Sequence, residues 1–424
     1  MPISAARFLH DVSQLAKRLP AAGHVINLCA DRYRFTVGFG AALMRGQINL
    51  LPPNRTPALL GRLLENYPDA YCLADIDHGH ATRKTVMFPE LDSTAPENID
   101  VPVVAAAQVA ALVLTSGSTG QPVPHRKTWG GLVRSARAER VRLGLADRAG
   151  ATIVGTVPPQ HMYGLESTVL LAMQGGFTMH TGRPFYPADV CAEIERTPRP
   201  RGLVTTPVHL RALLAEDSGL PPLDFLVCAT APLSPQLAAA AESRFAVPLH
   251  EVYGCTEAGQ IATRCTVLTP EWQTLDGVVL REDEYGTWVK GGHVDTEVLL
   301  GDVIEVRGTD RFLLHGRTAD LVNIAGKRTS LANLNYHLNS IEGVRDGVFV
   351  MPEEHGASVT RLTALVVAPG LTSETLMHAL RQRIDAAFLP RPLRLVSALP
   401  RNSTGKLPRE ALDTLVAELA AEDR

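Results

Sequence analysis

The chain has 424 residues, of which 45% are hydrophobic and 20% are charged, and its formal net charge is -3 at pH 7. This length predicts two or three domains, because a single hydrophobic core rarely serves more than about 250–300 residues. The slightly negative charge and the aromatic content of 5% argue against a nucleic-acid-binding surface.

The six cysteines are scattered and form no C-x-x-C pair. Such spacing in a long chain is typical of reduced cysteines and argues against a disulfide framework or a zinc site. Residues 1–20 carry charges throughout, and no segment has the length and apolarity of a membrane span. We therefore expect a cytoplasmic enzyme or binding protein. The sequence leaves the oligomeric state open between a monomer and a homodimer.

Strand-like and helix-like segments alternate from residue 109 to about residue 260. Strands are expected at 109–114, 151–157, 177–180, 203–206 and 225–227, and helices at 165–174, after 206 and after 232. This alternation predicts a mainly parallel sheet flanked by helices, with the ligand site beyond the carboxyl ends of its strands. The loop Thr115–Gly120, the loop Ala229–Ala231 and the pair Tyr253-Gly254 follow expected strands, so we expect them to line one crevice.

The pattern changes after residue 277 to short alternating stretches with Gly turns, which indicate a small antiparallel β region. A small α+β unit follows residue 326. It has strands at 347–351 and 362–367, a helix capped by Ser373 with Leu376, Leu380, Ile384 and Phe388 on one face, and a last helix opened by Pro408. The boundary near residue 318 gives an N-terminal domain of residues 1–318 and a C-terminal domain of residues 319–424.

The loop after the strand at 109–114 consists of small residues. It comprises Thr115, Ser116, Gly117, Ser118, Thr119 and Gly120. Small side chains let backbone N–H groups surround an anion, which is how such a loop holds phosphates. The loop lacks the Gly-Lys-Ser/Thr ending of the common P-loop, and taken alone it is equally well explained as a turn.

A second polar stretch combines an aromatic residue, a glycine and an acidic residue. Tyr253, followed by Gly254, offers a ring on which a purine can stack. Glu257, after Thr256, offers the hard carboxylate oxygens that Mg²⁺ prefers. An isolated carboxylate in this position is more often a surface residue. This stretch therefore indicates a Mg²⁺ contact only in combination with the phosphate loop.

Three more residues have the chemistry of nucleotide contacts. Asp302 offers acceptors for two ribose hydroxyls, and Arg317 offers a planar fork of donors for ribose or phosphate. Lys406 lies on a polar loop between two prolines near the C-terminus, and its charge would stabilise negative charge that develops on a phosphate. Taken singly, Asp302 and Arg317 are better explained as a turn and a surface residue, and Lys406 as a solvated lysine.

The order of these motifs resembles the adenylate-forming superfamily of acyl-CoA synthetases, stand-alone adenylation enzymes and luciferases. The series is TSGSTG at 115–120, PQHMYG at 159–164, ATAP at 229–232, YGCTE at 253–257, GD at 301–302, GR at 316–317, GKR at 326–328 and PRNSTGK at 400–406. The resemblance runs from about residue 111 to the C-terminus. It implies a large α/β N-terminal domain and a small, mobile α+β C-terminal domain.

The resemblance also implies a two-step ligase that uses ATP and Mg²⁺. A carboxylic acid would attack the α-phosphate of ATP to give acyl-AMP and pyrophosphate, and a thiol would then displace AMP. The loop 115–120 would hold the β- and γ-phosphates, Thr256 and Glu257 would contact phosphate and Mg²⁺, and Asp302 and Arg317 would contact ribose. The walls around adenine and the acyl group would include Ala229, Thr230, Ala231, Tyr253 and Gly254.

Three residues carry catalytic expectations from the same resemblance. Lys406 matches the lysine of the adenylation step, and His161 matches the histidine that shapes the acid pocket. Lys327, with Gly326, would face the site only after the C-terminal domain rotates between the two half-reactions.

The sequence departs from the family pattern at the phosphate loop and at the hinge. The loop continues as Pro122-Val123-Pro124 where relatives usually have Pro-Lys-Gly, and we hypothesise that Arg126 or Lys127 supplies the lost charge. The hinge position, usually Asp or Lys, is Ala319. The N-terminal region and the stretch between Glu257 and Asp302 are also short for the family.

The residues after His161 bear on the acid. Met162 stands where amino-acid-activating relatives tend to place a carboxylate, and an apolar residue there argues against an α-amino acid, because a buried ammonium needs a partner. Tyr163, Met173 and the loop Ala229–Ala231 favour an aryl or short acyl acid. The compact size and the run 125–129 resemble aryl-acid ligases of bacterial aryl-polyene or xanthomonadin-type pigment clusters, which load an acyl carrier protein. CoA fits as the acceptor equally well.

Two other interpretations stay open. The altered phosphate loop favours a catalytically impaired homologue that binds nucleotide or acyl chains, and the intact set of Glu257, Asp302, Arg317 and Lys406 opposes it. An amino-acid-activating adenylation enzyme is the second alternative, and it predicts exchange with amino acids rather than with aryl acids.

Overall fold

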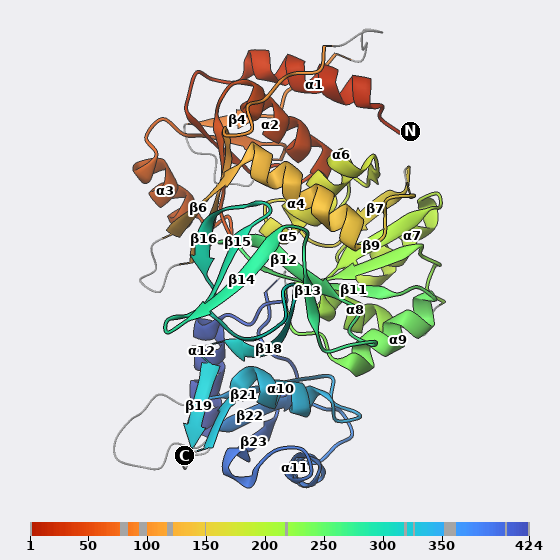
Figure 1. Ribbon diagram of the computed structural model, residues 1–424, viewed down its shortest axis with the longest axis vertical. Helices are drawn as coiled ribbons and strands as arrows, with labels where there is room; N and C mark the ends of the chain where they lie inside the picture. Colours follow the sequence, from red (N-terminus) through yellow and green to blue (C-terminus); the bar gives the residue numbers. More distant parts are fainter. Residues whose placement is uncertain are drawn as a thin grey trace.

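The computed structural model describes residues 2–76, 84–92, 100–116, 122–148, 150–216, 219–317, 320–324, 327–351, 362–402 and 405–422. Figure 1 shows the large sheets and their helices in the upper part of the molecule and the C-terminal elements gathered below them. This is the expected α/β fold with parallel-rich sheets flanked by helices. Within the described residues, no helix is both long and apolar enough to cross a membrane, and no disulfide joins any of the six cysteines.

The first sheet has the order β4-β3-β1-β2-β5-β6 and is parallel except for the antiparallel pair β5 and β6. Its elements are α1 (Ala5–Arg18), β1 (His24–Asn27), α2 (Arg32–Met44), β2 (Ile48–Leu51), α3 (Pro57–Asn66), β3 (Tyr71–Ala74), β4 (Thr85–Met87), β5 (Val109–Ser116) and β6 (Pro122–Thr128). The expected strand at 109–114 is confirmed as β5. Because it pairs with β2, residues from the first quarter of the chain form one sheet with the strand that leads into the phosphate loop.

The second sheet has the order β17-β18-β13-β12-β11-β10-β9-β7-β8. Its strands are β7 (Thr152–Gly155), β8 (Thr178–Met179), β9 (Arg201–Thr205), β10 (Phe225–Cys228), β11 (Leu249–Cys255), β12 (Gly259–Arg264), β13 (Trp272–Thr274), β17 (Asp302–Arg307) and β18 (Arg311–Arg317). The five strands from β8 to β11 are parallel, and the four from β12 to β17 continue the sheet in antiparallel pairs. The alternation of expected strands and helices is therefore confirmed here.

Helices pack on these sheets. They are α4 (Trp129–Arg142), α5 (Met162–Gly164), the π-helix η1 (Leu165–Leu170), α6 (Leu171–Gly175), α7 (Pro187–Arg196), α8 (Pro207–Leu214) and α9 (Pro235–Phe245). Several bury one face, whereas every residue of α5 and η1 is buried. In α8, the side chain of Thr206 caps the first turn, Pro207 occupies the first helical position, and Leu210 and Leu213 are fully buried. The expected helix at 165–174 is confirmed as part of a continuous helical stretch, and its residues 165–170 adopt the π conformation.

The small antiparallel β region is confirmed as a separate sheet of β14 (Val278–Asp283), β15 (Gly286–Gly291) and β16 (Val294–Leu299). Two contacts join this sheet to β6 and α4. Thr128 Oγ1 of β6 donates to Asp295 Oδ2 of β16 over 2.6 Å, and Arg134 of α4 pairs with the same carboxylate. This position brings residues 293–296 next to the end of β6.

The C-terminal elements have their own sheets and core. They are β19 (Leu321–Ile324), β20 (Lys327–Ser330), α10 (Leu331–Asn339), β21 (Asp346–Val350), β22 (Thr363–Val367), α11 (Ser373–Arg381), β23 (Leu393–Leu395) and α12 (Arg409–Glu422). Two expectations are wrong in detail. The cap of α11 is Thr372, which accepts from Thr375 N, and the helix ends at Arg381, so Ile384 and Phe388 lie beyond it, with Phe388 buried on a separate short turn. Thr318 and Ala319, at the expected boundary, lie outside the described residues.

Candidate active site

Four neighbouring parallel strands, β7, β9, β10 and β11, end at one edge of the second sheet. The loops that leave this edge carry His161, Thr206, the segment 229–231 and the segment 256–257. Polar backbone groups and side chains thus gather where ligands of parallel sheets bind. The pair Tyr253-Gly254 lies inside β11, which runs on to Cys255, so our expectation that it forms a loop after the strand is wrong.

The end of β5, the hairpin partner β6 and the end of β11 meet at one corner of this edge. Thr115 Oγ1 lies 2.9 Å from His125 Nε2, and the same nitrogen lies 3.7 Å from Glu257 Oε1. Lys127 Nζ donates to the backbone carbonyl of Glu257 over 2.7 Å. Ser116 is the last residue of β5, whereas Gly117, Ser118, Thr119 and Gly120 lie outside the described residues.

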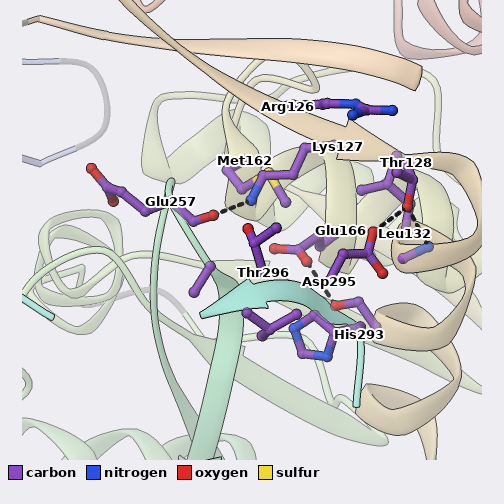
Figure 2. Close-up of a pocket in the computed structure, with 14 residues that line it drawn as sticks. Arg126, Lys127, Thr128, Leu132, Met162, Glu166, Glu257, His293, Asp295 and Thr296 are labelled. Atoms are coloured by element: carbon purple, nitrogen blue, oxygen red, sulfur yellow. Dashed lines mark hydrogen bonds between the residues drawn. The ribbon is translucent and has the colours of Figure 1, made fainter. Parts of the chain in front are cut away.

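The hairpin strand β6 sends alternate side chains to opposite faces. Lys127 is buried and reaches Glu257, whereas Arg126 is exposed and lies apart from it (Figure 2). Of the two residues expected to replace the lost charge, Lys127 is therefore the one beside Glu257. Val123 lies on the same face of the strand and is 42% exposed, so it borders the expected phosphate site without contributing a charge.

Burial shapes the charges at this corner. Desolvation lowers the pKa of His125, and the charge of Lys127 adds to this effect while Glu257 opposes it. The imidazole is therefore neutral near pH 7, and its Nε2 lies within hydrogen-bonding distance of Thr115 but not of Glu257. Desolvation also lowers the pKa of Lys127, and the nearby Glu166 is the largest influence in the other direction.

Glu257, the expected Mg²⁺ contact, lies open to solvent. Its side chain is 42% exposed at the edge of the sheet, and Thr256 beside it is partly exposed. No group of three or more metal-ligating side chains exists among the described residues. One exposed carboxylate with no dedicated cage suits Mg²⁺, which keeps several waters and takes other ligands from phosphates.

The loop after β10 is conformationally strained. Ala229 is buried, and Thr230 has a φ of +86°, which a β-branched residue rarely adopts. Strain of this kind persists where the surroundings enforce it and is concentrated at binding sites. The segment Ala229–Ala231 therefore has a fixed shape at the sheet edge, next to the ends of β9 and β11.

Tyr253 links the end of β11 to the antiparallel part of the sheet. Its hydroxyl donates to Asp302 Oδ2 over 2.8 Å, and its ring packs against Trp272 and Phe312 at centroid distances of 5.5 and 5.6 Å. Asp302 pairs with Arg317 in the ladder between β17 and β18. The carboxylate expected to contact ribose is thus held in place by a buried aromatic residue.

His161 meets the C-terminal domain. Its Nδ1 caps α5 by accepting from Tyr163 N over 3.2 Å. Burial, and secondarily the positive charge of Lys406, lowers the pKa of His161 to about 3. Residues separated by more than half of the chain therefore lie close enough to influence each other electrostatically, and His161 is neutral at physiological pH.

The loop that carries Lys406 is closed on itself and docked on α8. Asn402 holds both ends of the turn, because its Oδ1 accepts from Lys406 N over 2.9 Å and its N–H donates to Lys406 O over 2.8 Å. Gly405 has a φ of +79°, and a Cβ there would lie 2.9 Å from Val208. Glycine is therefore required both by the turn and by the close approach to α8.

Two sequence-predicted residues lie away from this edge. Lys327 is exposed and pairs with Asp385 over 2.6 Å inside the C-terminal domain, so the structure does not bring it to the site. Met173 is exposed on α6, which contradicts its expected place near the acid. Tyr163 is buried, and its hydroxyl bridges the carbonyls of Thr205 and Val227 at 3.2 Å, which is a structural role.

Sequence reasoning missed a set of buried polar side chains behind Met162. They are Ser135, Glu139, Glu166, Ser167, Gln260 and His293, and each is less than 9% exposed. Glu139 and Glu166 lie on α4 and on the π-helix, where acidic residues at helical spacing resemble a solvated surface. The sequence carried a signal for Glu166 alone, because it is the one charged residue in the segment 162–176, whereas α4 carries four arginines beside Glu139.

Residues 6–285 match the family described as AMP-binding enzyme. The 4-coumarate–CoA ligase of Rhodobacter capsulatus is 28% identical over 314 residues, which cover 73% of this chain and 78% of the relative. The 3-hydroxybenzoate–CoA/4-hydroxybenzoate–CoA ligase of Thauera aromatica is 23% identical over 360 residues, which cover 74% of this chain and 68% of the relative.

Solved structures give the same fold over nearly the whole chain. ATP-bound MatB from Rhodopseudomonas palustris superposes with a TM-score of 0.83 at 18% identity, covering 98% of this chain and 94% of the other. The o-succinylbenzoate CoA synthetase MenE from Bacillus subtilis, in complex with ATP and magnesium, superposes with a TM-score of 0.78 at 20% identity, covering 96% and 93%. The family match begins at residue 6, so the sequence-based resemblance from residue 111 missed the first quarter of the chain.

Proposed function

The chain belongs to the AMP-binding enzyme family, and from this premise we propose that it joins a small carboxylic acid to a thiol through an acyl-adenylate. The acid is aryl or short acyl, and ATP with Mg²⁺ supplies the energy. Relatives named as ligases of coumarate and hydroxybenzoate support an aryl acid and CoA as the acceptor. An acyl carrier protein is the alternative acceptor, as in the pigment-cluster ligases that the run 125–129 resembles.

The observation that carries this proposal is the position of Lys406 beside His161. The docking of Gly405 on Val208 brings a lysine from the C-terminal domain to the carboxyl edge of the large sheet. The same edge carries Glu257 and the end of the phosphate loop strand. Attack on a phosphate requires a cation, a carboxylate that binds a metal ion and a loop that binds an anion. We propose that these three groups meet at this edge of the sheet.

In the first half-reaction, a carboxylate oxygen of the acid bonds to the α-phosphorus as the bond from that phosphorus to the β-bridging oxygen breaks, and pyrophosphate leaves. Lys406 stabilises the negative charge that builds up on the oxygens around the α-phosphorus. His161 is neutral, so it lines the acid pocket without competing with Lys406 for the substrate charge. Mg²⁺ held by Glu257 would offset charge on the leaving pyrophosphate.

The remaining expected residues bind and orient the nucleotide. The loop Thr115–Gly120 would hold the β- and γ-phosphates, with Thr256 contributing a hydroxyl. Asp302, fixed by Tyr253, would accept hydrogen bonds from the ribose hydroxyls, with Arg317 beside it. The fixed loop Ala229–Ala231 would form a wall for adenine and the acyl group.

In the second half-reaction, the thiol sulfur bonds to the acyl carbon, and AMP leaves with the carboxylate-derived oxygen. We propose that the C-terminal domain, which begins near residue 319, turns to serve this step. Lys327 would reach the site only in that second orientation, which agrees with its pairing to Asp385 in the present one. Lid and domain closures of this kind often separate steps of one reaction.

The test is an isotope experiment with the purified protein, ATP, Mg²⁺ and a panel of acids labelled with ¹⁸O in the carboxylate. We expect pyrophosphate in the first step, and one labelled oxygen in AMP after transfer to CoA or to a holo carrier protein. Mass spectrometry of the thiol products identifies the acid and the acceptor together. Release of ADP and orthophosphate, or AMP without label, would contradict the proposal.

A further inference from the structure

Arg32, the first residue of α2, is a buried cation outside the candidate active site. It is 0% exposed. Its Nη2 donates to the carbonyls of Gly155 and Val157 at the end of β7, each over 2.9 Å. Its Nη1 donates to the carbonyls of His180 and Gly182 after β8, over 2.8 and 2.7 Å. One residue that follows the first sheet's β1 thus holds two segments that leave the second sheet.

Arginine is the side chain suited to this position. Its planar guanidinium group carries five N–H donors and can reach several carbonyl oxygens at once, whereas a lysine carries three donors on a single nitrogen. Burial lowers the pKa of Arg32 to about 10, so the group stays charged at pH 7. The space around it is closely fitted, because a Cβ at Gly155 would lie 2.9 Å from Arg32 Nη2. A buried charge is tolerated only when it is fully hydrogen-bonded, so these carbonyls are held firmly in place.

The first of the two segments leads directly to His161. Pro158 follows the last carbonyl of β7 that Arg32 holds, and its ring restricts the backbone there. His161 N donates to Pro158 O over 3.1 Å. The residue before His161 is also tied to the first sheet's side of the molecule, because Gln160 Nε2 donates to Cys29 O over 2.6 Å. Two side chains, Arg32 and Gln160, therefore anchor the turn that carries His161.

The second segment supports the helix on which the lysine loop docks. Phe185 follows the carbonyls after β8 that Arg32 holds, and its ring packs edge-on against His209 of α8 at a centroid distance of 5.1 Å. His209 Nδ1 lies 2.8 Å from Oγ1 of Thr206, the cap of the same helix. A Cβ at Gly405 would lie 3.5 Å from that Oγ1. The segment after β8 therefore packs on the end of α8 that receives the lysine loop.

These contacts place Arg32 at the junction of the two parts that meet at His161 and Lys406. We propose that Arg32 is a positioning residue for adenylation, which fixes His161 and the docking surface of the lysine loop relative to each other. The described residues expected to bind phosphate and ribose lie on or next to β5, β11, β17 and β18, and Arg32 forms no hydrogen bond with any of them. Arg32 therefore acts on the acid rather than on MgATP.

This inference rests on the proposed function and adds a residue to it. The first test measures kcat and both KM values for pyrophosphate release in Arg32→Met and Arg32→Lys. The KM for the acid should rise about tenfold or more in Arg32→Met and about threefold or more in Arg32→Lys, which keeps a buried donor, while the KM for MgATP changes less than about threefold. Arg34→Met is the matched control, because Arg34 is exposed on the same helix, and it should leave both KM values unchanged.

The second test removes the other anchor of the same turn. Gln160→Met keeps the length of the side chain and loses the donor to Cys29 O. It should raise the KM for the acid about fivefold or more and leave the KM for MgATP within about threefold. A purely structural role would lower kcat in proportion to the folded fraction and leave both KM values unchanged. That result, or an equal rise of the two KM values, would overturn the inference.

Failure of the inference is distinguishable from failure of the proposed function. If the wild-type protein releases no pyrophosphate with any acid, the proposed function fails and the inference fails with it. If the wild type is active and Arg32→Lys and Gln160→Met keep its KM for the acid, only the inference fails. Urea unfolding gives the folded fraction of each variant, and these two variants test the inference even where Arg32→Met does not fold.

Discussion

Asp346 holds the lysine-bearing loop in position, and its charge is the most informative one to remove. Its carboxylate accepts two hydrogen bonds from Arg401 at 2.7 and 2.8 Å, and Arg401 in turn donates to Gly405 O over 3.0 Å. Arg211 on α8 of the N-terminal domain lies 4.0 Å from the same carboxylate. The predicted consequence of Asp346→Asn is that Lys406 loses its fixed position while the fold persists.

The size of the effect follows from the geometry. Hydrogen bonds to charged partners contribute about 1.5–3 kcal/mol each. Asp346 and Arg401 are 16% and 21% exposed, and asparagine still accepts one of the two bonds, which reduces the loss. We expect a net cost of about 2 kcal/mol to the adenylation pose, which corresponds to about a 30-fold lower rate of adenylation.

The assay separates the half-reactions. ATP–pyrophosphate exchange reports adenylation, and transfer from chemically supplied acyl-adenylate to a thiol reports the second step. Only the first should fall in Asp346→Asn, mainly through kcat. Asp413→Asn is the matched control, because Asp413 pairs with Arg409 at an exposed i,i+4 site where such pairs contribute little. Equal loss in both half-reactions, or an unchanged exchange rate, would refute the reasoning.

Three further predictions address other parts of the molecule. Lys406→Ala should lower pyrophosphate release by about 100-fold or more, as expected for loss of a transition-state charge contact, and should spare transfer from supplied acyl-adenylate; equal loss in both would remove its assigned role. Val123→Lys should lower the KM for MgATP by restoring a cation at the phosphate loop, and an unchanged KM would show that Lys127 or another group already compensates. Burial raises the pKa of Glu139 to about 8, so the native state binds its proton more tightly than the unfolded chain and stability falls as the pH rises from about 4.5 through 8. Glu139→Gln should therefore flatten that decline in urea unfolding at several pH values, and an unaltered slope would show that Glu139 ionises normally.

The sequence predicted the second sheet well because its signals are local. Apolar runs at β9 and β10, capped helices such as α8, and Gly turns in the antiparallel region each follow from a few neighbouring residues. The order of the motifs then predicted which loops share one edge. The strands in the first quarter of the chain were not predicted, because they are short. They can be assigned to a sheet only once their pairing with β5 is known.

The buried polar network could not be read from the sequence for a physical reason. Glu139 and Glu166 occupy helical positions where charge is usually solvated, and their burial depends on where α4 and the π-helix η1 pack. The π-helix itself has no dependable local signal, because one extra residue per turn is stabilised by its surroundings rather than by its composition. Likewise, the role of Lys127 depends on β6 lying beside Glu257, which only the assembled sheets decide.

The contact between the large sheets and the C-terminal elements shares no hydrophobic cluster among the described residues. Within the described residues, each hydrophobic cluster stays on one side of residue 320: the clusters of the large sheets end at Leu314, and those of the C-terminal elements begin at Val322. The contacts between these two parts near Lys406 include the long one between Arg211 and Asp346 and the close approach of Gly405 to Val208. Parting such a contact exposes little apolar area, so its cost is small compared with opening a core. Under the mechanism that we propose, the same lysine loop would be held for adenylation and released for transfer, which a shared hydrophobic core would prevent.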